Sequence, residues 1–95
     1  MIRQEGDRLL IEGPVTISTV TALLAQVREL LAAGVAVLDF KGATDVDSAA
    51  VALALECMRE AERRKLALTF ANLPAALKNL AELYSVSELL QAEPA

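Results

Sequence analysis

The 95-residue sequence contains no histidine and no tryptophan, a single cysteine, and only two phenylalanines and one tyrosine. Without histidine there is no imidazole to activate a nucleophile or bind a metal ion, and one cysteine can form neither an internal disulfide nor a cysteine-based zinc site. Few aromatic rings are present to stack on bases, and thirteen acidic against nine basic residues give a net charge of −4 instead of a surface that attracts phosphate. The composition therefore predicts a protein without a metal ion or cofactor, and it argues against most small enzymes and against nucleic-acid binding.

The sequence also lacks an apolar run that could cross a bilayer, although its mean hydropathy is high at +0.42. The longest uncharged stretch, residues 13–27, contains glycine, proline and four hydroxyl side chains before Ala22, whereas a spanning helix needs about 20 predominantly apolar residues. The first residues do not show the basic and then apolar order of a signal peptide. We therefore expect a cytoplasmic protein that does not itself insert into a membrane. A protein partner is one natural place for its surplus apolar surface.

The pattern of apolar residues predicts one mixed α/β domain over residues 1–95, with elements in the order ββαβαβα. Gly6 lies in a turn between two short strands, which predicts an opening hairpin. Short connections between the later strands and helices predict right-handed crossovers and a largely parallel sheet. We expect strands at residues 2–4, 8–12, 35–40 and 66–70.

Three helices are expected between and after these strands. The first runs from Ile17 to a stop at Gly34 and is capped by Thr16 or Ser18, and the second covers residues 48–65. Residues 72–74 open the third helix, whose apolar residues include Leu77, Leu80 and Leu83. A final turn at 87–90 and a frayed end at 91–95 are expected to follow.

Residues 41–47 are predicted to connect the strand 35–40 to the helix 48–65, and they bring Asp45, Asp47 and Ser48 to the start of that helix. At a helix N-terminus, free backbone N–H groups and the positive end of the dipole stabilise negative charge. The simpler interpretation is that Asp47 or Ser48 caps the helix. The alternative is that Ser48 is an exposed hydroxyl used for regulation or partner binding. Nucleophilic catalysis by Ser48 is the least favoured of the three interpretations, because the sequence has no histidine to activate the hydroxyl group.

The helix predicted over 48–65 is apolar on all sides through its first two turns. At about 100° per residue, Leu53 falls among the charged side chains, near Ala49 and Ala52. A helix that is apolar all round is usually buried all round, so Leu53 is either an isolated surface leucine or the anchor of a partner interface. The expected core stripe comprises Val51, Ala54, Cys57, Met58 and Ala61, and the expected solvated face comprises Glu56, Glu60, Arg63 and Arg64.

Residues 38–48, which read Leu-Asp-Phe-Lys-Gly-Ala-Thr-Asp-Val-Asp-Ser, resemble the STAS domain. In that family an apolar strand and a small connection lead to Asp-Ser or Asp-Thr at the start of a helix. The resemblance extends over nearly the whole chain: residues 13–16 look like the approach to the first helix, and residues 73–77 and 83–86 look like the last helix and its end. It implies a four- or five-stranded mixed sheet with helices packed against it, and no catalytic activity.

Within the family, residues 47–53 and 81–84 look most like the small STAS subunit of the Mla phospholipid transporter. This resemblance implies a cytoplasmic subunit, peripheral to the inner membrane, that binds the ATPase of an ABC transporter maintaining outer-membrane lipid asymmetry. We expect the isolated chain to be able to form a weak homodimer as well. The expected interface comprises Asp45, Asp47, Ser48, Ala49, Ala52 and Leu53.

The other well-known branch of the family contains the anti-sigma factor antagonists. In those proteins a partner kinase phosphorylates the serine that matches Ser48. A glycine commonly stands where this chain has Ala50, which counts somewhat against this branch.

Overall fold

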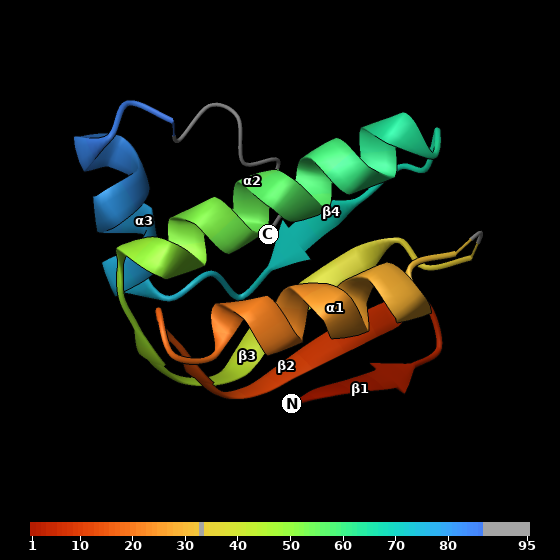
Figure 1. The fold of residues 1–95 in the computed structure, drawn as a ribbon, viewed down its shortest axis with the longest axis horizontal. Coiled ribbons are helices and arrows are strands. Elements are labelled where there is room, and N and C mark those ends of the chain that lie inside the picture. Colours follow the sequence, from red (N-terminus) through yellow and green to blue (C-terminus); the bar gives the residue numbers. More distant parts are fainter. Residues whose placement is uncertain (33, 87–95) are drawn as a thin grey trace.

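The computed structural model describes residues 1–32 and 34–86. The predicted ββαβαβα order and mixed α/β class are confirmed, whereas the turn expected at 87–90 and the frayed end lie outside the described residues. The elements are β1 (Ile2–Glu5), β2 (Arg8–Val15), α1 (Val20–Leu30), β3 (Val37–Val46), α2 (Ser48–Arg63), β4 (Thr69–Ala71) and α3 (Ala75–Leu83) (Figure 1).

The four strands form one mixed sheet in the order β1-β2-β3-β4. β1 pairs antiparallel with β2, and β2, β3 and β4 are parallel to one another. Figure 1 shows α1 and α2 lying side by side across one face of the sheet, with α3 beside the start of α2. Because each parallel strand is followed by a helix, the carboxyl ends of β2, β3 and β4 and the N-termini of all three helices gather at one edge of the sheet. We call it the carboxyl edge.

The core lies between the sheet and the helices. Alternate strand residues face it, including Leu38 and Phe40 of β3 and Phe70 of β4, and the two phenylalanine rings meet edge to face with centroids 6.1 Å apart. Cys57 of α2 is a buried core residue, as predicted, and burial raises the pKa of its thiol to about 12. None of the helices in the described parts of the chain is long and apolar enough to span a membrane.

The strands β2 and β3 are longer than the sequence predicted. Residues 41–46, expected in a polar connection, continue β3, and β2 continues past Gly13 and Pro14, which were expected to end it. The two extensions pair with each other, with register shifts, through Glu12 with Gly42 and Val15 with Val46. The pairing requires a very small residue at position 42, because a Cβ atom there would lie 2.9 Å from the carbonyl oxygen of Ile11. Long-range pairing therefore overrides the local preference of these residues for a loop.

The helix boundaries also differ from the prediction. α1 begins at Val20 instead of Ile17, and neither Thr16 nor Ser18 is its N-cap; that position is Thr19. The Thr19 hydroxyl accepts a hydrogen bond from the Thr16 amide and donates one to the Pro14 carbonyl, so it holds the preceding residues in a turn. In α3, Leu77 is buried as expected, but Leu83 is 73% exposed.

Glu60 of α2, predicted on the solvated face, is buried with 4% of its surface exposed. The C-terminal end of α1 packs beside it, so this side of α2 is not open to solvent. Its carboxylate accepts hydrogen bonds from Arg63 and, at 2.7 Å, from Arg64 Nε. Arg64 also donates to the carbonyl oxygens of Arg28 and Leu31 at the end of α1. The guanidinium therefore caps the carbonyl groups that α1 leaves unpaired and ties the two helices together.

On the face of the sheet opposite Phe40, Asp39 is a second buried carboxylate, 4% exposed. It accepts hydrogen bonds from the Lys41 amide at 2.8 Å, from Asn72 Nδ2 at 2.9 Å and from Arg8 Nη1 at 3.1 Å. Burial by itself raises the pKa of Asp39, but these hydrogen bonds outweigh burial and hold the pKa below its ordinary value. The network connects β2, β3 and the residue that follows β4.

Both buried carboxylates predict a loss of stability in acid. The hydrogen bond from Arg63, with that from Arg64, lowers the pKa of Glu60 from 4.5 to about 2, against the opposing effect of burial. An unfolded chain therefore binds the proton at a higher pH than the folded chain does. The contribution of the ionised Glu60 side chain to the free energy of unfolding is therefore complete above about pH 4.5, and it is lost as the pH falls toward 2. Melting temperatures measured from pH 6 to pH 2 should fall in this window. The fall should be smaller in Glu60→Gln, and an equal fall in that variant would contradict the assignment.

Candidate partner-binding site

Ser48 lies at the carboxyl edge of the sheet, where β3 ends and α2 begins. The pairing of Val46 with Val15 brings the end of β3 beside the end of β2. The predicted start of the helix at Ser48 is confirmed, and the residue is exposed.

Asp47 is the N-cap of α2, which confirms the simpler interpretation of this position. Its Oδ1 accepts a hydrogen bond from the Ala49 amide at 2.8 Å, and its Oδ2 accepts one from the Ile17 amide at 3.0 Å. The first bond satisfies an unpaired N–H group of the helix. The second ties the segment before α1 to the start of α2, so one carboxylate sets the relative position of the two chain segments.

The six residues predicted at the interface are not equally accessible. Leu53, expected among the charged side chains on an open face, is 3% exposed, and Ala49 is buried as well. The placement of Leu53 on the surface is wrong, because α1 packs along that side of α2. Asp47 is half-buried, whereas Asp45, Ser48 and Ala52 are exposed.

Ile17 is an apolar residue of this site that the sequence did not reveal. Its side chain is 76% exposed, and its amide is held by Asp47, next to Ser48. The sequence pattern placed Ile17 on the buried face of a helix that in fact begins three residues later. The turn-forming hydroxyl residues Thr16, Ser18 and Thr19 were the available signal that the helix starts later.

A hollow of about 120 Å³ lies in the seam between α1 and α2. We call it the α1–α2 hollow. It is close to the surface residues described above, because Ala52 belongs to both. The residues that line it are Val20, Thr21, Leu24, Ala49, Ala52, Leu53 and Glu56.

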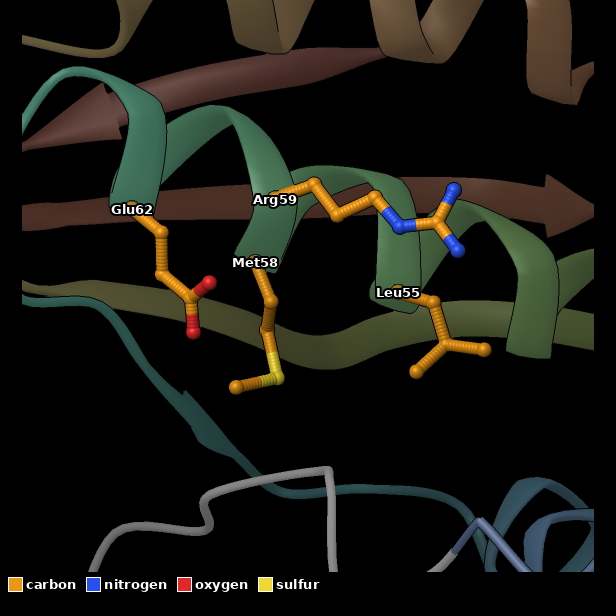
Figure 2. Close-up of a pocket in the computed structure, with 4 residues that line it drawn as sticks. All are labelled: Leu55, Met58, Arg59 and Glu62. Carbon is orange, nitrogen blue, oxygen red and sulfur yellow. The ribbon is translucent and has the colours of Figure 1, made fainter.

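A larger hollow, of about 210 Å³, lies on the flank of α2 that faces away from α1. Figure 2 shows Leu55, Met58 and Glu62 extending from one side of the helix, with Arg59 running along it. Arg59 pairs with Glu56 at 2.6 Å. These side chains contain two apolar groups and two charges of opposite sign, which is not a constellation for nucleophilic or acid–base chemistry.

Solved structures share this fold over most of the chain. The anti-sigma factor antagonist SpoIIAA in its unphosphorylated form matches with a TM-score of 0.69 and 15% identity, covering 99% of this chain and 87% of that chain. A putative anti-sigma factor antagonist from Thermotoga maritima matches with a TM-score of 0.73 and 7% identity, covering 100% and 86%. A sulfate transporter family protein from Wolinella succinogenes matches with a TM-score of 0.65 and 18% identity, covering 87% and 69%.

The mixed sheet and its helices are thus a STAS-type fold. A family model described as "Mlab, STAS domain" matches residues 2–91, and the chain belongs to this family of STAS domains. No curated protein matches the sequence significantly. STAS domains are generally non-enzymatic binding domains.

Proposed function

We propose that this chain is a non-enzymatic STAS subunit that binds the ATPase of an ABC transporter, and that the transporter moves phospholipids to maintain outer-membrane asymmetry. The binding surface comprises Ile17, Asp45, Ser48 and Ala52, and we call it the Ser48 surface. The exposure of Ile17 beside Ser48 carries the proposal, since an apolar side chain that is 76% exposed next to a helix start is suited to a protein contact. The family description and the resemblance of residues 47–53 to the Mla subunit support this choice of partner.

The chemistry around Ser48 supports a role in binding instead of catalysis. The sequence contains no histidine, and both carboxylate oxygens of the neighbouring Asp47 already accept hydrogen bonds from backbone amides. A serine hydroxyl is a weak nucleophile unless an adjacent base takes its proton. Within residues 1–32 and 34–86, no basic group forms a hydrogen bond with the Ser48 hydroxyl.

The first test is recovery of the partner. The tagged chain, expressed in its own cells and purified from mildly solubilised membranes, should co-purify with an ABC-transporter ATPase and its permease. Recovery of a protein kinase or a sigma-factor regulator in their place would overturn the proposal.

A second candidate function, an anti-sigma factor antagonist, is favoured by one observation. Ser48 is exposed at the first position of α2, where a helix N-terminus favours the negative charge of a phosphate group. Intact-mass analysis of the protein from its own cells separates the two functions. A transporter subunit should carry no phosphate. A phosphorylated fraction that changes with growth conditions would favour the antagonist.

Ser48→Asp is expected to fold normally and to bind the ATPase at least tenfold more weakly. The helix dipole tolerates the new charge, but the charge lies near Asp45 and must be desolvated in the contact. Ser48→Ala should lose less affinity for the ATPase than Ser48→Asp does, because it removes only a hydroxyl group. Asn79→Asp adds the same charge on the exposed side of α3 and should leave binding unchanged. Affinity and melting temperature should be measured on all four proteins, and equal binding by Ser48→Asp and wild type would place the interface elsewhere.

A further inference from the structure

Residues 16–19, which we call the Ile17 turn, are closed by hydrogen bonds between the first and last residues. The Thr19 amide donates to the Thr16 carbonyl at 2.9 Å, and the Thr16 amide donates to the Thr19 hydroxyl at 2.9 Å. Ile17 and Ser18 are the central residues, positions that usually hold glycine, proline or short polar residues. The Ile17 side chain is 76% exposed there, so it adds little buried apolar area to the fold. These bonds fix the shape of the turn but not its position relative to α2.

Asp47, the residue before α2, joins the Ile17 turn to the start of that helix. Its Oδ2 accepts a hydrogen bond from the Ile17 amide at 3.0 Å, and its own amide donates to the Val15 carbonyl at 3.4 Å. Asp47 therefore contacts the chain on both sides of Thr16, where β2 leads into the turn. The contact with the Ile17 amide is made by a side chain, so a substitution can remove it without breaking the backbone bond to Val15.

The contact with Ile17 exceeds what a helix cap requires. Oδ1 of Asp47 alone satisfies the free N–H group of Ala49 at 2.8 Å, and asparagine and serine, which offer a single acceptor oxygen, are similarly favoured as N-caps. Aspartate differs from both because it has a second carboxylate oxygen, and here the Ile17 amide uses it. Since Asp47 is half-buried and both its oxygens are engaged within the chain, its effect on a partner is exerted through Ile17.

We propose that Asp47 is a positioning residue for partner binding, which holds the Ile17 turn against the start of α2 so that Ile17 and Ser48 form one preformed surface. The proposal deepens the proposed function and rests on it for the identity of the partner. A turn released from Asp47 samples other positions. The apparent Kd then rises in inverse proportion to the fraction of molecules whose turn is in the position that binds.

Asp47→Asn isolates the contribution of the second oxygen. When the asparagine oxygen caps Ala49, its NH2 group faces the Ile17 amide, so two donors meet and the tie is lost while the cap remains. Exchange of the Ile17 amide hydrogen with solvent, measured by NMR, should become about tenfold faster or more, while Leu38 and Phe40 in β3 should exchange as in wild type. Asp47→Ser, which also caps but has one oxygen, should behave alike. Unchanged exchange at Ile17 in both variants would overturn the proposal, whichever partner is recovered.

Binding to the co-purified ATPase measures the consequence for the partner. Asp47→Asn should raise the Kd about tenfold or more, as expected if the released turn is in the binding position about a tenth of the time. Asp7→Asn removes the same charge in the exposed turn between β1 and β2, at the opposite edge of the sheet. It should change the Kd by less than about twofold, because a distant surface charge is screened.

A double-mutant cycle with Ile17→Ala shows whether Asp47 acts through Ile17. Ile17→Ala should raise the Kd of the wild type about tenfold, but that of Asp47→Asn by only about twofold or less, because the turn is already released. Additive effects, or an unchanged Kd in Asp47→Asn, would overturn the positioning role and leave the proposed function standing. If Ile17→Ala bound as tightly as wild type, the Ser48 surface itself would be wrong, and the positioning role with it.

Discussion

Truncation of Leu53 to alanine is expected to destabilise the domain by about 2–5 kcal/mol, the usual cost of removing a fully buried leucine side chain. Leu53 is 3% exposed and packs in the seam between α1 and α2, so its removal opens a cavity at the contact that joins the two helices. Domains of this size are stable by roughly 5–15 kcal/mol, so this one substitution should remove a large share of the total.

Urea unfolding followed by circular dichroism measures this loss. Leu83→Ala is the matched control, because Leu83 is 73% exposed and its truncation should change stability by about 0.5 kcal/mol or less. Equal unfolding midpoints for the two variants would mean that Leu53 is not a core residue. A Leu53 variant should therefore not be used to test partner binding, since lost binding would only report lost folding.

Asn72→Ala is expected to destabilise the domain by about 2–3 kcal/mol, from two separate causes. The Asn72 amide donates to the buried carboxylate of Asp39 at 2.9 Å, and a hydrogen bond to a charged group contributes about 1.5–3 kcal/mol. Asn72 also has a φ of +53°, a left-handed conformation that asparagine tolerates better than alanine does.

Asn72→Gly separates the two causes. Glycine loses the hydrogen bond to Asp39 but adopts a positive φ without strain, so this variant should be less damaging than Asn72→Ala. Thermal unfolding of both variants at pH 7 provides the comparison. If the glycine variant were the less stable of the two, the conformation of residue 72 would not be a source of strain.

Several features of this protein follow from its sequence alone, and they share a local physical origin. The order of the elements follows from apolar periodicity and from turn residues such as Gly6. The start of α2 and its cap follow from the preference of an aspartate for the position before a helix, where its carboxylate satisfies a free N–H group. Cys57 and Leu77 lie in the core as their helical spacing predicts. Each of these signals acts over a few residues and needs no knowledge of distant segments.

The tertiary structure alone decided which surfaces remain open. A helical wheel shows that α2 has apolar and charged sides, but it does not show which of them α1 will cover, and the packing of α1 buries Leu53 and Glu60. The pairing of β2 with β3 likewise converts an expected loop into strand, and the Asp47–Ile17 hydrogen bond holds Ile17 beside Ser48. These outcomes depend on contacts between residues that are far apart in the sequence, and the energies of these contacts exceed the local conformational preferences. Local sequence patterns therefore indicate where the candidate site lies. They do not determine which of its side chains a partner can reach.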